Sequence, residues 1–185
     1  MPSSYTPLGV ELMVTGEQAG LWGDKTNTNL NILSQIVGGY NSQAVNGTGD
    51  TPLNVSDGAT GATVANRIIE LTGTITGNIT VSIPLDVENF YIIKNSTSGA
   101  FTVEFQYTSG SGTSVTFSAT DKGTKFVYAK AHDGTNPNIV DVFSEFSQIN
   151  LVNRNELRFQ DATGGQYIGL RAATTVGSSF TLNLP

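Results

Sequence analysis

The feature that most limits the fold of this chain is a succession of short apolar runs, separated by turn signals, between residues 62 and 146. Each run is too short for a helix that is stable in water, and Gly- and Asn-rich clusters interrupt the chain between them. The runs that we predict to be strands are Asn66–Leu71, Asn78–Ile83, Asn89–Lys94, Ala100–Tyr107, Ser114–Ser118, Lys125–Ala131 and Ile139–Val142. Short strands at this spacing favour a β-sandwich domain built from antiparallel strands over residues 62–146.

Side-chain alternation indicates which strands contribute most to the core of this sandwich. In the run Phe101–Tyr107 every odd-numbered residue is apolar and every even-numbered residue is polar, so one face is expected to be buried. The run Phe90–Ile93 is apolar at every position, as in strands that are covered on both faces. We therefore predict that this strand is central, or that the helix or another subunit lies over it.

Composition excludes several classes of function. The formal net charge is −6 with only nine Lys and Arg residues, so the chain lacks the clustered cations that bind a nucleic-acid backbone. There is no cysteine, which excludes disulfides and thiolate zinc sites. The N-terminus has no basic segment followed by an apolar run, and no stretch is long and apolar enough to cross a membrane, so we expect neither Sec-dependent secretion nor membrane insertion.

Residues 1–50 are predicted to form an extended arm followed by one short docking helix. Pro2 and Pro7 disfavour helix in the arm. The apolar positions of the helix recur at a spacing of three and four residues, and they are Leu30, Leu33, Ile36 and Val37. Thr26 or Thr28 can cap its start, and Gly38-Gly39 can end it. Because a helix of about three turns is marginal in water, its stripe needs a cover, either the β domain or another protein or sister chain.

The remaining segments are a linker and a C-terminal stalk. The stretch 41–61 is polar, Gly-rich and aperiodic, and we place the linker proper at residues 51–61. Residues 147–185 hold three apolar runs joined by Gly-rich turns, which cannot bury a core alone, so we expect a β-stalk intertwined with identical chains, preferably three. The predicted oligomer interface comprises Leu157, Phe159, Tyr167, Ile168, Leu170, Phe180, Leu182 and Leu184.

The sequence gives little indication of catalysis or of a cofactor. His132 lies in a predicted hairpin turn, and no nucleophile or orienting acid is marked beside it. The carboxylates that would have to form a glycosidase pair are Asp86 with Glu88, Glu104, and Asp141 with Glu145. We interpret them as solvated surface residues, and we expect no enzymatic activity, no cofactor and no bound metal.

Two stretches resemble the tail-fibre and tail-associated structural proteins of tailed bacteriophages, especially those that infect marine bacteria. The first is Gly16–Leu30, in which a Gly, then Trp-Gly, then paired Asn and Leu precede a helix. The second runs through Leu157–Asp161 and Gly165–Leu170 to Phe180–Pro185, and it is similar to a shaft element of the same proteins. Family chains usually continue past this element into a longer fibre and a receptor-binding tip, whereas this sequence stops at Pro185.

The resemblance implies a virion structural protein of a phage tail, assembled in the host cytoplasm. In that family the N-terminal part anchors to the tail and the distal part points to the host. The candidate docking residues carried over are Leu21, Trp22, Asn27, Asn29, Leu30 and Leu33. The missing tip suggests an adaptor or short fibre, or a sandwich that meets the host itself.

Two other functions stay open at this point. A carbohydrate-binding module would contact host glycans through an exposed aromatic platform, for which Tyr91, Tyr107 and Tyr128 are the candidates. A capsid decoration protein would share the structural role but not the tail location. A host glycan, sister chains and other tail proteins are thus the partners considered.

Overall fold

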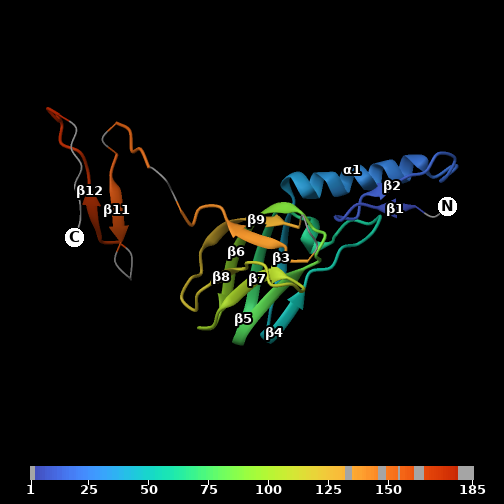
Figure 1. Ribbon diagram of the computed structural model, residues 1–185, viewed down its shortest axis with the longest axis horizontal. Helices are drawn as coiled ribbons and strands as arrows, with labels where there is room; N and C mark the ends of the chain where they lie inside the picture. The colour runs from blue at the N-terminus through green and yellow to red at the C-terminus, as the bar shows by residue number, and fades with distance from the viewer. Residues whose placement is uncertain (1–2, 132–134, 146–148, 154, 161–164, 179–185) are drawn as a thin grey trace. The chain divides into compact units, whose positions relative to one another are not determined.

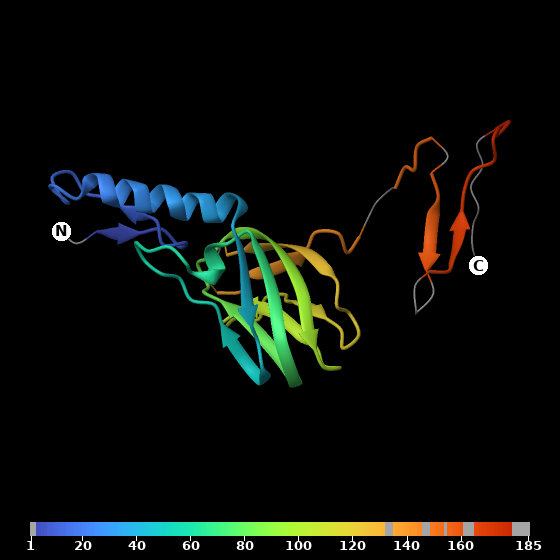
Figure 2. The ribbon, with the colours of Figure 1, turned by 180° about the vertical axis from the view of Figure 1, so that it is seen from behind.

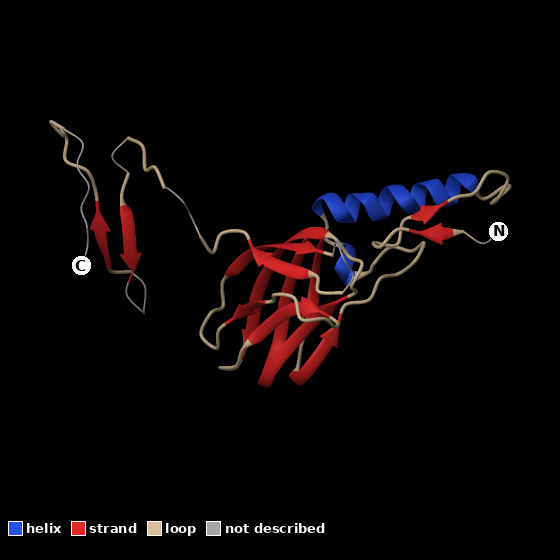
Figure 3. Cartoon of the chain, viewed as in Figure 1, coloured by secondary structure: helices blue, strands red, loops and turns tan. Residues whose placement is uncertain are grey.

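The computed structural model describes residues 3–131, 135–145, 149–153, 155–160 and 165–178 (Figure 1). The chain divides into two compact units, Met1–Ser144 and Glu145–Pro185, and each is described by itself. Strands account for 41% of the structure and helices for 12%, so the predicted mainly-β class is confirmed. Figure 3 shows a long helix and a short helical turn, both blue, in a chain otherwise built from strands and loops.

The N-terminal segment forms a small hairpin that lies beside the helix. Strands β1 (Ser4–Tyr5) and β2 (Glu11–Leu12) pair antiparallel. Helix α1 (Trp22–Gly38) begins earlier than the predicted start near Thr28, and the residue before it makes no side-chain cap. The Thr28 hydroxyl instead donates to the carbonyl of Asp24 inside the helix, 3.0 Å away. Because an acidic side chain in the first turn complements the helix dipole, Asp24 favours this earlier start.

Two strands occupy a stretch that the sequence predicted to be polar and unstructured. Strands β3 (Tyr40–Ala44) and β4 (Gly47–Pro52) pair parallel with the following long strand. Apart from Thr51 and Pro52, these strands lie before the predicted linker proper at residues 51–61, and apart from Tyr40 they lie inside the broader aperiodic stretch 41–61. The expectation of a structureless connection is therefore wrong for this part, because backbone pairing to a neighbouring strand replaces the missing apolar pattern. A single 3₁₀ turn, η1 (Thr63–Ala65), follows.

The centre of the first unit is a long strand that belongs to two layers. Strand β5 (Ile68–Ile83) pairs through its first half with β3 and β6 (Asn89–Ser98), and through its second half with β4 and β7 (Val103–Tyr107). All four of these pairings are parallel. We call the three stacked segments rungs: rung 1 is β3 with β4, rung 2 is β5, and rung 3 is β6 with β7.

Rungs 2 and 3 repeat with one constant spacing. Ile68 is paired with Ile92 at one end and Ile83 with Tyr107 at the other, and both partners lie 24 residues later (92 − 68 and 107 − 83). The prediction of an antiparallel sandwich is therefore wrong for these strands. Only residues 84–88 lie between β5 and β6, so β5 must bend for its parallel neighbour to follow without the long crossover that flat parallel sheets need.

Antiparallel strands close the far end of the stack. Strand β8 (Val115–Phe117) pairs antiparallel with β7, and β9 (Thr124–Lys130) pairs antiparallel with β6. Strand β10 (Asn138–Asp141) lies beside β9, and the Ile139 N–H donates to the carbonyl of Thr113 at 2.9 Å. This contact brings the last strand next to the segment before β8, so the eight-stranded sheet is nearly closed, like a barrel.

One hydrophobic core fills the inside of the bent stack. Val103, Phe105 and Tyr107 are buried as their alternation predicted, and the ring of Tyr91 meets that of Phe105 edge-on at 5.7 Å. Phe101, however, lies before β7 and is exposed. The apolar run of β6 is central, as predicted, because β5 and β9 flank this strand, with Tyr91 pointing inward.

The second unit contains one hairpin. Strands β11 (Leu157–Gln160) and β12 (Tyr167–Leu170) pair antiparallel, with Leu157 opposite Leu170 and Phe159 opposite Ile168. The third predicted run, from Phe180 onward, lies outside the described residues.

Candidate functional site

One face of α1 is used inside the molecule. Ile32 is fully buried, and the Asn29 side-chain amide binds both backbone groups of Glu11: it donates to the carbonyl and accepts from the N–H, each at 2.9 Å. The Lys25 ammonium lies 3.1 Å from the Glu11 carboxylate. Together these contacts hold the N-terminal hairpin against the helix.

Glu11 is the buried charge of this arrangement, and it is kept ionised. The Ser3 hydroxyl donates to its carboxylate at 2.7 Å, and the Gln18 amide donates to the same oxygen at 3.0 Å. The hydrogen bond from Ser3, followed by that from Lys25, lowers the pKa of Glu11. The hairpin is thus fixed to α1 by a charge whose hydrogen-bond capacity is largely satisfied.

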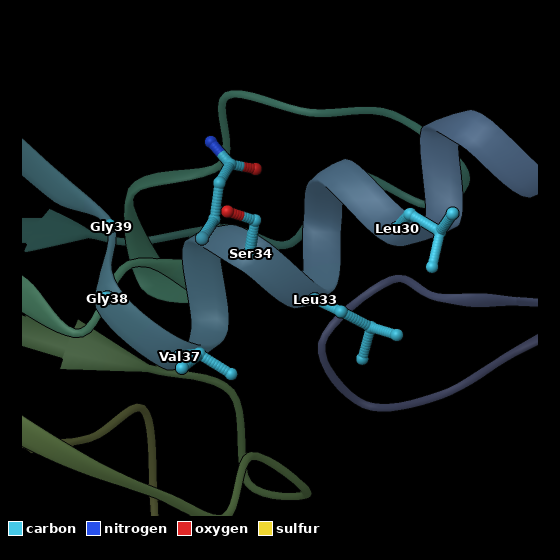
Figure 4. A pocket seen from close by; sticks show the side chains of 7 residues that line it. Leu30, Leu33, Ser34, Val37, Gly38 and Gly39 are labelled. Carbon is cyan, nitrogen blue, oxygen red and sulfur yellow. The ribbon is translucent and has the colours of Figure 1, made fainter.

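The face of α1 beside these contacts carries exposed apolar side chains, although Leu33 also lies near the N-terminal arm, with which it lines a pocket. Leu30, Leu33 and Val37 all point to one side of the helix (Figure 4), and Val37 is 74% exposed. Leu21 and Trp22 at the start of the helix are also exposed, Trp22 by 63%. We call these five residues the helix stripe.

A shallow groove runs along the C-terminal half of this face. It is lined by Leu30, Leu33, Ser34, Gln35, Val37, Gly38 and Gly39 (Figure 4). The only charged residues of the helix are Asp24 and Lys25, near its start. The groove therefore offers apolar contact without a charge of its own.

The structure separates the residues that the helical pattern had grouped. Ile36 was predicted in the same stripe, but it is half-buried and packs against the core. Asn29, a candidate docking residue from the resemblance, uses its side chain to hydrogen-bond the backbone of Glu11, whereas Asn27 is exposed. Val37 belonged to the predicted stripe but not to the docking set, and its exposure identifies it as the residue that sequence reasoning missed there.

The C-terminal hairpin presents a second uncovered apolar face. Because residues paired across strands share a face, Leu157, Phe159, Ile168 and Leu170 lie on one side of it. All four are exposed, and Ile168 is 72% exposed. On the other side, the Arg158 guanidinium stacks over the Tyr167 ring at 4.2 Å. We call the four apolar residues the hairpin face.

Phe180, Leu182 and Leu184 lie outside the described residues, and so does His132.

Three of the carboxylates considered for catalysis are engaged by neighbouring groups. Glu88 accepts a hydrogen bond from the Tyr128 hydroxyl, and Glu104 accepts one from the Ser114 hydroxyl at 2.5 Å. Asp141 lies 3.0 Å from the Lys125 ammonium. Across the described ranges, no group of three or more His, Cys, Asp or Glu residues is arranged to hold a metal ion.

The aromatic platform expected for glycan binding is not formed by the predicted tyrosines. Tyr91 and Tyr107 are buried, and their hydroxyls donate to the carbonyls of Val64 and Val87 at 2.8 and 2.7 Å. Burial raises the pKa of both phenols. Only Tyr128 of the three is partly exposed, so the expectation fails for the other two.

Comparison of the chain with protein-family models, curated proteins and solved structures finds no match. In the part of the chain that the structure describes, no helix has the length and apolar character of a membrane span.

Proposed function

We propose that this chain is a non-enzymatic structural subunit of a bacteriophage tail, a fibre or fibre adaptor that anchors to the tail and supports adsorption to the host. The family resemblance of its two ends supports the location. The single observation that carries the structural role is that the helix stripe and the hairpin face leave their apolar side chains in solvent. Exposed apolar side chains that cluster on one element are typical of interaction sites.

In this proposal the helix stripe docks on a neighbouring tail protein. Leu21, Trp22, Leu30 and Leu33 of the original docking set contribute contacts, and Val37 extends them by one turn. The firm attachment of the helix to the hairpin through Asn29 supports this role, because a preordered surface loses less entropy on binding.

The hairpin face is proposed to assemble with identical chains, preferably three, into a stalk. An isolated two-stranded hairpin is marginally stable in water, and covering Phe159 and Ile168 with sister chains supplies the missing burial. A matched pair of variants tests this step by sedimentation of the full chain. Ile168→Asn on the apolar face is expected to lower the oligomer mass, whereas Gln160→Asn on the other face is not. Equal masses for both variants and the wild type would remove the hairpin from the interface.

The decisive experiment for the tail role is the position of the protein in the particle. An antibody raised against the first unit is applied to intact particles of the phage that encodes the chain, and the particles are imaged by electron microscopy. Label at the tail is the expected result. Label spread over the capsid would assign a decoration protein instead, and particles without label would refute a virion role.

A further inference from the structure

The stack of rungs is closed at one end and open at the other. Beyond rung 3, β8 and β9 add an antiparallel segment, and β10 follows. On the outer side of rung 1 no further strand is paired: within the described ranges, β3 and β4 pair with β5 alone. Figure 2 shows these two strands, sky-blue and cyan, one after the other along the near side of the sheet. The outer side of rung 1 is therefore a sheet edge.

Half of the backbone groups of β3 face this edge. The Val45 N–H donates to the Thr72 carbonyl at 2.8 Å, so Val45 faces β5. Because the direction of the backbone groups alternates along a strand, Ser42 and Ala44 direct their N–H and C=O groups away from β5. Their side chains are exposed as well.

The same reasoning applies to β4. The Leu53 N–H donates to the Ser82 carbonyl at 2.7 Å, so Leu53 faces β5. Asp50, three residues before Leu53, therefore directs its backbone groups outward, and the regular alternation ends at the register shift between Gly47 and Gly49. Rung 1 thus offers donors and acceptors on both sides of its bend.

The bend of rung 1 has room for a neighbour. Gly47 is paired with Ile75, and Gly99 lies 24 residues after Ile75, so the two glycines hold equivalent places in the stack. Both have positive φ. A Cβ on Gly99 would lie 2.2 Å from the Ile75 carbonyl oxygen of the preceding rung, whereas a Cβ on Gly47 would meet nothing within 4 Å. At Gly47 the place of a preceding rung is empty.

The edge also lacks the usual protection against pairing. Neither β3 nor β4 contains Lys or Arg, and the only charged residue is Asp50. Pro52 removes one donor, but it lies at the end of β4. Natural edge strands are commonly blunted by lysines or prolines, so this edge is open to a further strand.

We propose that rung 1 is a self-pairing edge, through which two copies of the chain join antiparallel about a two-fold axis at Asn46. The protein contains the precedent for this arrangement, because rung 3 already pairs with an antiparallel bent segment: its first half, β6, meets β9, and its second half, β7, meets β8. In the same way, β3 of one copy meets β4 of the second copy.

The occupant is a second copy because the two halves of the edge complement each other. In this register Ser42 faces Asp50 of the second copy, a hydroxyl opposite a carboxylate, and Ala44 faces Thr48. No like charges oppose each other, since Asp50 is the only charge. A nearly uncharged edge gives no electrostatic selection for a different, charged partner. The open edge of rung 1 pairs with itself and closes, as two-fold interfaces do.

The inference is independent of the proposed function, because it concerns the core and not the helix stripe or the hairpin face. Whatever number of copies the hairpin face assembles, edge pairing doubles it. Blocking the edge is therefore expected to halve the mass of the assembly. Loss of the hairpin interface alone changes only the number of copies that the hairpin face joins.

The test compares two substitutions at one edge position in the full chain by light scattering after gel filtration. Ala44→Pro removes an outward N–H that makes no bond to β5, and proline is tolerated at such positions. Ala44→Val keeps the N–H and serves as the control. We expect half the wild-type mass for Ala44→Pro and the wild-type mass for Ala44→Val. Equal masses for a folded Ala44→Pro variant and the wild type would overturn the proposal.

Hydrogen exchange of the wild-type protein decides the matter even if Ala44→Pro does not fold. The amides of Ser42 and Ala44 are expected to exchange at least about a hundredfold more slowly than unpaired amides in the associated protein, and to lose this protection on dilution. Unprotected amides at every concentration would refute edge pairing. Protection that persists at the halved mass would assign the edge to another part of the same chain and would equally refute the second copy.

Discussion

The contrast between Asn27 and Asn29 tests how α1 is held. Asn29→Ala removes two hydrogen bonds of 2.9 Å and leaves the N–H and C=O of Glu11 without these partners. At about 1 kcal/mol for each bond, the loss is about 2 kcal/mol. Alanine regains about 0.5 kcal/mol of helix propensity, so a net loss of about 1.5 kcal/mol is expected. Asn27 is exposed on the same helix, and Asn27→Ala is expected to gain only the propensity term.

Urea denaturation of the two variants and the wild type measures this difference. The free energy of unfolding should fall for Asn29→Ala and rise slightly for Asn27→Ala, so that the two differ by about 2 kcal/mol. Limited proteolysis should also cut the N-terminal hairpin faster in Asn29→Ala, because the hairpin is held through Glu11. Variants of equal stability, with equal proteolysis, would refute the attachment of the hairpin through Asn29.

Three further predictions concern the rest of the first unit. The Lys94 ammonium, with the hydroxyls of Ser96 and Tyr40, lowers the pKa of Glu70 from 4.5 to about 2. The ionised carboxylate therefore stabilises the fold above pH 4.5, and this contribution disappears as the pH falls towards 2. Glu70→Gln should flatten the acid-unfolding profile between these two pH values, and an unchanged profile would contradict the prediction. The Thr26 hydroxyl oxygen is buried without a hydrogen-bond partner, so Thr26→Val should raise the free energy of unfolding by about 1 kcal/mol in urea melts, and a loss would show that the hydroxyl is satisfied. Gly99→Ala should lower the free energy of unfolding by about 3 kcal/mol, because the new Cβ lies 2.2 Å from a carbonyl oxygen of β5. Gly47→Ala should lower it by about 1 kcal/mol, from the positive φ of this residue alone. Thermal melts that show equal stability for the two variants would contradict the packing of the rungs.

Most of the core strands could be placed from the sequence, but their pairing could not, and the two predicted strands Asn66–Leu71 and Asn78–Ile83 are wrong as separate elements because β5 continues through the residues between them. A period of two is the same for parallel and antiparallel strands, so the alternation in β7 shows which face is buried and says nothing of its neighbour. The 24-residue repeat was present as two Ile-Ile pairs, Ile68-Ile69 and Ile92-Ile93. The 24-residue repeat leads to parallel pairing only if each rung bends. That bend depends on contacts between rungs, which the sequence does not show.

Rung 1 was missed for a related reason. Its residues are polar or glycine and are mostly exposed, so they carry no apolar period. Their strand conformation is imposed by the edge of β5, which offers unpaired backbone groups to the segment before it. A local pattern cannot report such a long-range cause.

The helix stripe was predictable as an apolar pattern, whereas the face of α1 that would be covered was not. Spacing alone groups Ile36 with Leu33 and Val37. Which of these side chains is buried depends on the hairpin, distant in the sequence, that Asn29 and Lys25 hold. That hairpin is held against one face of the helix, and Leu30 and Val37 stay exposed on the face beside it.

The area left open on α1 is too small to hold a partner by itself. Complete burial of a large apolar side chain contributes about 1.5–3 kcal/mol, and the five residues of the helix stripe are already partly covered, so their remaining contribution is roughly 6 kcal/mol. Association itself costs about 4–15 kcal/mol, which leaves little or no net affinity for the stripe in a single copy. Joining several copies through the hairpin face presents several stripes at once, and the second attachment then becomes intramolecular. Stable anchoring in the proposed role therefore requires the oligomer, because one helix docks weakly and several docked together do not.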